Sequence, residues 1–168
     1  LKPSLRTYNS LTALDESPLR EGLIYVGADD GSVTRTTDGG ETWEPLTNKF
    51  EFGPGEKFVT KIHASPSHAE TAYISFTGQY YDDFRPHLFR TADAGETWIR
   101  ISGDMPSEAV VLAIVEHPDN PELLFAGIHN GLMVSLNGGQ NWVRAGSNLP
   151  PASVNEIKIN IVISSCMD

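Results

Sequence analysis

A short motif that ends in tryptophan recurs three times and constrains the fold of this chain more than any other feature. The copies are Thr36–Trp43, Thr91–Trp98 and Ser135–Trp142. Each has a hydroxyl residue, then Asp or Asn, then glycine, then Thr or Asn before the tryptophan. All three tryptophans of the chain close a copy, and the copies begin 55 and 44 residues apart. That spacing is typical of supersecondary units that pack side by side as structural repeats.

The motif itself predicts a tight turn that satisfies its own polar groups. Glycine adopts positive φ at little cost, and a short Asp or Asn side chain accepts hydrogen bonds from turn amides. The following tryptophan is expected to open a strand and bury a large apolar surface. We assign these structural roles to Asp38, Gly40, Thr42, Trp43, Asp93, Gly95, Thr97, Trp98, Asn137, Gly139, Asn141 and Trp142. The alternative, a calcium loop, needs more oxygen ligands than one Asp and a neighbour such as Glu41 supply.

Four short runs rich in β-branched, aliphatic and aromatic residues accompany each motif. In the second repeat they are Val59–Ala64, Thr71–Ser75, His87–Arg90 and Trp98–Ile101, each bounded by turn residues. Runs of this kind are typical of strands, and four in succession predict a four-stranded meander. We therefore expect an all-β chain built of β-propeller blades, about three of them, each a four-stranded antiparallel sheet.

The repeat boundaries predict a single partial propeller domain over residues 1–168. Blades are expected at about 11–48, 58–103 and 110–147, and a fourth blade begins and fails within 153–168. Three blades would leave open strand edges, which invite pairing. The ring is therefore either incomplete or closed by oligomerisation, so self-association through the blade edges is expected. A truncated product without its own function is the remaining alternative.

Composition excludes several classes of function. The chain has 12 basic and 22 acidic residues, a formal charge of −10, and no basic run, which argues against nucleic-acid binding. It contains no apolar stretch of about 18 residues, so no membrane insertion is expected. The histidines lack metal-ligand spacing and no glycine-rich phosphate loop stands apart from the motifs, so we expect no metal and no cofactor.

The repeated motif resembles the Asp-box, or BNR, repeat. Together with Ser17-Pro18 and the Leu23–Gly27 run, it is similar to sortilin/Vps10-like and glycosyl-hydrolase-like BNR propellers. The resemblance implies that the boxes are structural corners, and it implies an extracellular or periplasmic location. The third box departs from the pattern at Asn137 and Asn141, so a weaker corner is expected there.

Sialidases also carry these boxes, but their chemistry needs an arginine cluster and a tyrosine nucleophile. Arg35 and Arg90 occupy equivalent positions beside two boxes, which indicates a repeated structural role instead.

Strand order predicts where function resides. The boxes lie at one end of each blade, so the loops around residues 29–31, 78–86 and 129–131 share the opposite end. The segment Gly78–Pro86 is longer than its counterparts and rich in aromatic and charged residues, and such variable loops commonly carry binding. Equally, the segment could be a longer hairpin whose aromatic residues cover the neighbouring blade. The ligand-binding candidates are Tyr80, Tyr81, Asp82, Asp83, Arg85 and His129. The weaker catalytic candidates are Asp29, Asp30, Asp82 and Asp83.

Two functions remain open at this stage. The favoured one is a non-catalytic BNR propeller segment that presents its loop face to a protein or glycan. The alternative is part of a BNR-type glycoside hydrolase that acts on a polysaccharide through two carboxyl groups.

Overall fold

Short antiparallel strands joined by tight turns make up nearly all of the regular structure. The computed structural model describes residues 10–50, 57–146 and 148–160. The first sheet contains β1 (Leu11–Glu16), β2 (Ile24–Ala28), β3 (Val33–Thr36) and β4 (Glu44–Pro45). The second contains β5 (Phe58–Ala64), β6 (Ala72–Gly78), β7 (Asp83–Thr91) and β8 (Ile99–Arg100). The third contains β9 (Val111–His117), β10 (Asn120–Ile128), β11 (Gly131–Ser135) and β12 (Val143–Arg144). Two single-turn 3-10 helices, η1 (Thr47–Lys49) and η2 (Gln79–Tyr81), complete the described elements.

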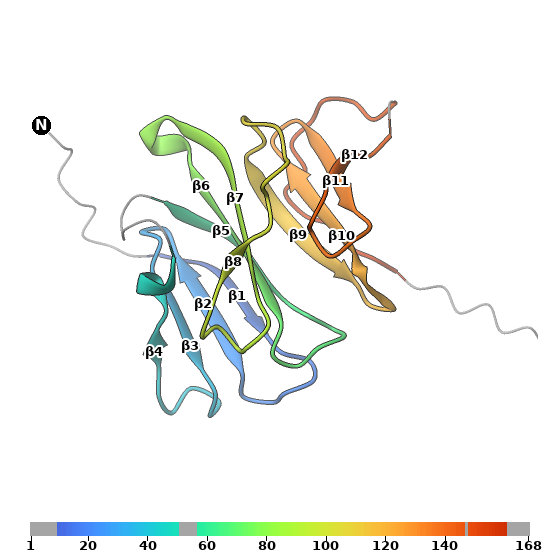
Figure 1. Ribbon diagram of the computed structural model, residues 1–168. Helices are drawn as coiled ribbons and strands as arrows, with labels where there is room; N and C mark the ends of the chain where they lie inside the picture. Colours follow the sequence, from blue (N-terminus) through green and yellow to red (C-terminus); the bar gives the residue numbers. More distant parts are fainter. Residues whose placement is uncertain (1–9, 51–56, 147, 161–168) are drawn as a thin grey trace, which may run out of the picture.

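Each sheet is a four-stranded meander whose strands pair in chain order. We call the sheets blades 1, 2 and 3. They lie side by side in chain order, and the first strand of each blade contacts the first strand of the next (Figure 1). The predicted fold class, all-β propeller blades, is therefore confirmed.

The β6–β7 hairpin differs from the expected loop. Its strands extend beyond their counterparts in the other blades, so the connection shrinks to Gln79–Asp82. Asp83, Arg85 and Pro86, expected in a loop, belong to β7. The surplus residues therefore lengthen the hairpin, as the alternative to a variable loop predicted, and ion pairs to Asp83 hold an otherwise unfavourable strand residue in place.

Apolar side chains fill the spaces between neighbouring blades. One buried cluster joins blades 1 and 2 and includes Tyr25, Leu46, Val59, Phe76 and Phe89. A second joins blades 2 and 3 and includes Tyr73, Leu88, Met105, Ile114 and Trp142. The backbones approach closely at Gly27, where an added Cβ would lie 2.4 Å from Val59 Cγ1.

The segment after blade 3 approaches β10 in the way that β5 approaches β2. An added Cβ on Gly127 would lie 2.3 Å from the Val154 carbonyl oxygen, and Val154 N–H donates to the Ile128 carbonyl at 3.1 Å. Residues 152–160 form no strand. The expected failure of the fourth blade at 161–168 lies outside the described residues.

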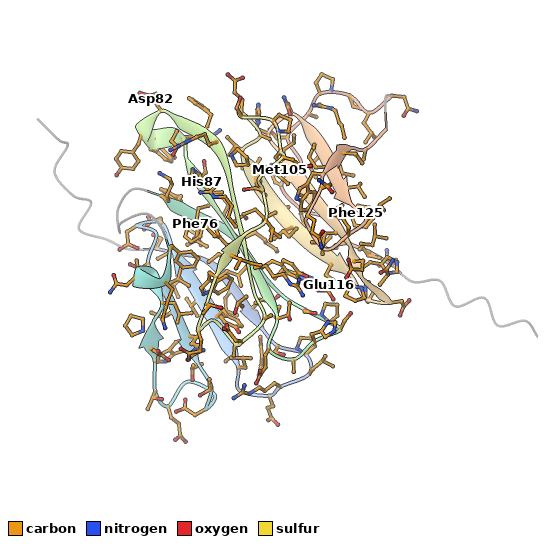
Figure 2. All side chains as sticks on the ribbon, in the orientation of Figure 1. Phe76, Asp82, His87, Met105, Glu116 and Phe125 are labelled. Atoms are coloured by element: carbon orange, nitrogen blue, oxygen red, sulfur yellow. The ribbon has the colours of Figure 1, made fainter. Side chains whose placement is uncertain are left out.

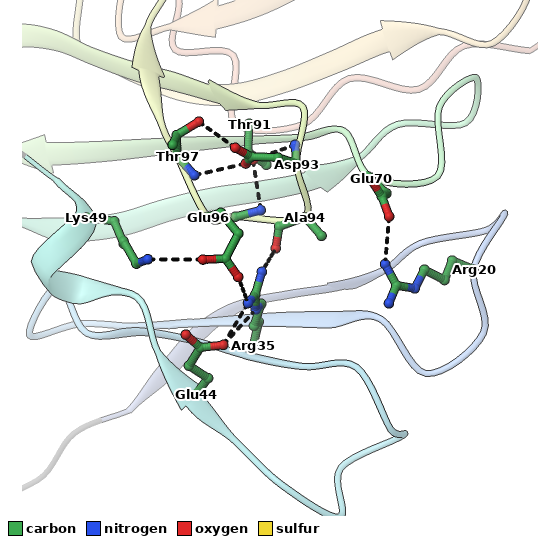
Figure 3. A network of polar contacts seen from close by, with 11 residues as sticks. Arg20, Arg35, Glu44, Lys49, Glu70, Thr91, Asp93, Ala94, Glu96 and Thr97 are labelled. Carbon is green, nitrogen blue, oxygen red and sulfur yellow. Dashed lines mark hydrogen bonds and ion pairs between the residues drawn. The ribbon is translucent and has the colours of Figure 1, made fainter.

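The boxes form closed rings of hydrogen bonds. In the second box, Thr97 donates through its N–H at 2.9 Å and its hydroxyl at 2.7 Å to the Asp93 carboxylate, and Thr91 donates at 2.8 Å (Figure 3). Bonding from Thr97 lowers the pKa of Asp93 to about 2. The first box repeats these bonds, and the hydroxyl bond from Thr36 holds the pKa of Asp38 below its usual range.

The third box keeps the same ring with neutral partners. Asn137 Oδ1 accepts from Ser135 Oγ at 3.0 Å and from Asn141 N–H at 2.9 Å, and Asn137 Nδ2 donates to Asn141 Oδ1 at 3.0 Å. Asn141 Nδ2 also donates to Asp104 at 3.2 Å. Charge-assisted bonds are stronger than neutral ones, so this ring is held less tightly than its counterparts.

The box tryptophans pack against the preceding blade. Trp98 contacts Tyr25 edge-on at 6.3 Å between ring centroids, and Trp142 donates its indole N–H to the Ile101 carbonyl at 2.6 Å. Trp142 is 5% exposed, whereas Trp43 is 47% exposed. The expectation of a buried tryptophan is therefore wrong for Trp43, because no sheet precedes blade 1 among the described residues.

Candidate functional site

The hairpin connections opposite the boxes form the candidate site. We define the loop face as the connections β2–β3 (Asp29–Ser32), β6–β7 (Gln79–Asp82) and β10–β11 (His129–Asn130). The β6–β7 hairpin projects furthest, with Asp82 at its tip and His87 deeper in the molecule (Figure 2). Asp82 has a left-handed backbone with φ of 58°, which lets the chain reverse directly before Asp83.

Asp83 is the centre of a largely buried charge cluster. Its carboxylate accepts from Lys57 Nζ at 3.1 Å, from Arg85 Nε and Nη2 at 2.9 Å each, and from His87 Nε2 at 3.0 Å. The side chains of Lys57 and Asp83 are only 8% and 11% exposed. Hydrogen bonds from Arg85, aided by Lys57, hold the pKa of Asp83 well below its usual range although burial opposes this. Asp83 is therefore a fixed anion and unsuited to donate a proton.

His87 extends the cluster into the blade. Arg100 Nη2 lies 3.3 Å from His87 Nδ1, and a guanidinium can only donate. Nδ1 therefore accepts, and Nε2 carries the proton that it donates to Asp83. Burial lowers the pKa of His87, with Asp83 opposing and Lys57 and Arg85 reinforcing the shift. The ring is neutral near pH 7 and fixed in one tautomer.

Lys57 links the connections of blades 1 and 2. An added Cβ on Gly31 would lie 2.5 Å from the Lys57 carbonyl oxygen, so the β2–β3 turn rests against this backbone. In that turn the Asp29 carboxylate accepts from Ser10 N–H at 3.0 Å and the Asp30 carboxylate from Ser32 N–H at 2.9 Å. Both aspartates are half-buried. The structure therefore brings the turn that carries Asp29 and Asp30 next to the Asp83 cluster.

The β6–β7 hairpin carries three exposed aromatic side chains. Tyr80 is 69% exposed and stacks on Phe58 with 5.2 Å between ring centroids. Tyr81 and Phe84 are 61% and 45% exposed. One face of Tyr80 thus covers Phe58 of its own blade, whereas the alternative expected these rings to cover a neighbouring blade.

His129 lies apart from the other candidates, on blade 3. Its carbonyl accepts from Ser153 Oγ at 2.9 Å, and its Nδ1 is buried without a hydrogen-bond partner. Sequence reasoning missed Lys57, Phe58, Phe84, His87 and Arg100. A pattern of charges alternating along 83–87 was the available signal for His87; nothing local marks Lys57, which is distant in sequence.

Two further kinds of feature are absent from residues 10–50, 57–146 and 148–160. These residues contain no cluster of three His, Cys, Asp or Glu side chains that could hold a metal ion. They also contain no helix long and apolar enough to cross a membrane.

Comparison with known proteins identifies the repeat. The model for the BNR/Asp-box repeat matches residues 34–45, the turn that contains the first box. A xyloglucanase of Paenibacillus sp is 27% identical over 137 residues, covering 74% of this chain and 13% of that protein. An oligoxyloglucan-reducing end-specific xyloglucanase of Emericella nidulans is 27% identical over 162 residues, covering 91% of this chain and 20% of that protein. The chain thus spans at most a fifth of the length of these relatives.

Solved structures show the same blade architecture. YCF48 from Cyanidioschyzon merolae matches with a TM-score of 0.62 and 24% identity, covering 83% of this chain and 38% of that chain. An ancestral GH74 enzyme matches with a TM-score of 0.64 and 21% identity, covering 82% of this chain and 18% of that chain. The recognition of a BNR propeller similar to glycosyl hydrolases is therefore confirmed, while the sortilin resemblance stays a prediction.

Proposed function

For this chain of BNR/Asp-box propeller blades, we propose a role as a glycan-contacting segment of a xyloglucanase-like glycoside hydrolase. The observation that carries the proposal is the extended β6–β7 hairpin, which exposes Tyr80, Tyr81 and Phe84 and is held by the ion pairs of Asp83. The similarity to xyloglucanases over most of the chain supports it. The alternative predicted from sequence is thus better supported than the non-catalytic interpretation.

The chemistry of the hairpin suits a neutral polysaccharide. Tyrosine rings offer apolar faces for sugar rings and hydroxyl groups that hydrogen bond at their edges. Asp82 at the tip offers carboxylate oxygens to sugar hydroxyls. Asp83 acts as the positioning residue, because its bonds to Lys57, Arg85 and His87 fix the hairpin before a ligand arrives. A preorganised loop loses less conformational entropy on binding.

A catalytic contribution, if this segment makes one, rests on Asp29. Glycoside hydrolysis needs two carboxyl groups, one of which donates a proton. Asp83 is held ionised by its ion pairs and is excluded from that role. Asp29 is half-buried, directly follows β2 in the same turn as Gly31, and accepts one bond from Ser10 N–H. Asp30 and Asp82 remain weaker candidates, since Asp30 closes its own turn and Asp82 lies at an exposed tip.

Binding of xyloglucan oligosaccharides to the 168-residue chain tests the proposal. Isothermal titration should detect binding that Tyr81→Ala weakens about tenfold, the loss expected from one stacking side chain. Leu136→Ala is the matched control, because Leu136 is 73% exposed but lies within the third box at the opposite end of the blade. Equal binding by Tyr81→Ala and the native chain would refute a role for the loop face. Asp29→Asn should abolish any hydrolysis while oligosaccharide binding remains.

A non-catalytic loop face for a protein or glycan is the second candidate. The observation that favours it is the ion pairing of Asp83, which removes one predicted carboxyl from proton transfer. Binding of xyloglucan with no hydrolysis and no effect of Asp29→Asn would select this candidate. Either function fits an extracellular or periplasmic location, which the resemblance to xyloglucanases supports.

Self-association is a further part of the proposal. Trp98 and Trp142 each pack on the preceding blade, whereas Trp43 presents a half-exposed indole at the equivalent place. A second copy of the chain offers a blade to cover it. Light scattering behind a sizing column should give a mass near twice 18.4 kDa for the native chain, and Trp43→Glu should give the monomer. A native monomer at all concentrations would contradict this arrangement.

A further inference from the structure

Arg35 joins blade 1 to the box of blade 2 through an ionic network. Its Nε and Nη2 donate to Glu44 Oε2 at 3.2 and 2.7 Å (Figure 3). It also donates to the Ala94 carbonyl and pairs with Glu96, both in the second box. The Arg35 side chain is only 8% exposed, so these two carboxylates satisfy an otherwise buried cation.

Arg90 is the counterpart of Arg35 one blade later. Arg35 pairs across the sheet with Glu44, and Arg90 pairs in the same register with Ile99. In the following box, Gly138 takes the place of Ala94, because each donates its N–H to the carbonyl of the preceding turn. By the same bonding, Gln140 takes the place of Glu96. Both carboxylates that neutralise Arg35 are therefore missing around Arg90.

A pocket of about 320 Å³ lies at this position between blades 2 and 3. We call it the Arg90 pocket; Arg90, Ile99, Ile101, Glu122, Asn137 and Gln140 are among its lining residues. Arg90 Nε is buried without a hydrogen-bond partner. A guanidinium stays charged in proteins, and a buried donor without a partner is unfavourable. The lining includes one carboxylate, Glu122, but no hydrogen bond or ion pair joins it to Arg90 among the described residues, so the buried Nε–H lacks the partners that Arg35 has.

We propose that the Arg90 pocket binds a uronic acid, a sugar that carries a carboxylate. The ligand carboxylate would take the place that Glu44 and Glu96 occupy around Arg35, where a guanidinium can form paired charge-assisted bonds. Ile99 and Ile101 provide apolar surface for the sugar ring, and Glu122, Asn137 and Gln140 provide partners for its hydroxyls. A neutral sugar would leave the guanidinium unpaired. This site is separate from the loop face, because the third box that lines it lies at the opposite end of the blade.

Titration of the chain with D-galacturonate and D-glucuronate, followed by NMR of the arginine Nε–H resonances, tests this site. We expect the Arg90 Nε–H resonance to shift on binding, and the neutral sugars D-galactose and D-glucose to bind at least about tenfold more weakly, the loss of one charge-assisted pair. Arg90→Gln should abolish uronate binding. Arg20→Gln is the matched control, because Arg20 of blade 1 forms an exposed ion pair with Glu70 of blade 2, away from the Arg90 pocket.

Gln140→Glu provides a second, independent variant. It restores the carboxylate found at the equivalent Glu96, so it should pair with Arg90, abolish uronate binding and leave the protein folded. The assignment is overturned if the native chain binds neither uronate, or if either variant binds them as the native chain does. It is also overturned if acetate or a peptide with a free C-terminal carboxylate binds as tightly as the uronates, because the sugar would then not be recognised.

Discussion

Replacement of Trp142 by alanine should destabilise the chain far more than the same change at Trp43, although the two residues hold the same place in the motif. Trp142 is 5% exposed, and a buried aromatic side chain removes roughly 150–250 Å² from water, worth about 4–6 kcal/mol at ~25 cal/mol per Å². Truncation of a buried Phe or Trp to alanine typically costs about 3–5 kcal/mol, so about 4 kcal/mol is the working estimate. Trp43 is 47% exposed, so it buries about half as much area and about 2 kcal/mol is expected.

Phenylalanine variants separate the apolar contribution from the hydrogen bond. Trp142 donates its indole N–H to the Ile101 carbonyl at 2.6 Å, so Trp142→Phe should lose about 1–2 kcal/mol. The buried indole N–H of Trp98 has no partner, so Trp98→Phe should cost less than Trp142→Phe.

Urea unfolding of the 168-residue chain, followed by far-UV circular dichroism, measures these differences by linear extrapolation. Circular dichroism is preferred to tryptophan fluorescence, because each substitution removes one of the tryptophans. The slope of the free energy of unfolding against urea concentration should be the same in all variants, so that the transition midpoints can be compared directly. Equal destabilisation by Trp43→Ala and Trp142→Ala would refute the conclusion that box tryptophans act by packing on the preceding blade.

The remaining predictions concern pH and close packing. Because the pKa of His87 is lowered in the folded chain, the unfolded chain binds more protons below about pH 6.5, and stability should fall as the pH drops through this range. His87→Gln should reduce the difference between the free energies of unfolding at pH 7.5 and pH 5.5, each measured by urea unfolding. An unchanged difference would exclude His87 as its source. The pKa of Asp83 is also lowered, so its contribution is present above about pH 4 and is lost in more acidic solution. Gly27→Ala should destabilise by about 1–3 kcal/mol through its clash with Val59, whereas Gly103→Ala, with no atom within 4 Å of the added Cβ, should be nearly neutral in the same assay.

The fold was predictable because the motif reports on local structure that is the same in every blade. Hydroxyl, Asp and glycine at fixed offsets form the turn from residues two to four positions apart, as the bonds around Asp93 show. Such contacts need no information about distant parts of the chain. The loop face followed in turn from strand order alone.

The contacts of the Asp83 cluster were not predictable, because they join residues that are far apart in the sequence. Asp83 is held in a strand by Lys57, 26 positions earlier, and this pairing exists only after β5 and β6 have aligned. The exposure of Trp43 likewise depends on whether a neighbouring sheet is present. The surplus of residues near 78–86 was correctly located, but its division between strand and turn was set by tertiary ion pairs.

The Arg35 network gives the two blade interfaces different sensitivities to dissolved salt. Its carboxylate partners Glu44 and Glu96 are about half exposed, so ions in solution screen these pairs. The equivalent place around Arg90 holds no such pair among the described residues, and Trp142 joins blades 2 and 3 through apolar contact, an indole N–H bond to the Ile101 carbonyl and a backbone N–H bond to the Asp104 carboxylate. In an array where each unit contacts only its neighbours, stability is close to a sum of interface contributions. Added salt should therefore weaken the contact between blades 1 and 2 more than the contact between blades 2 and 3, so ionic strength changes the relative stability of the two ends of this array.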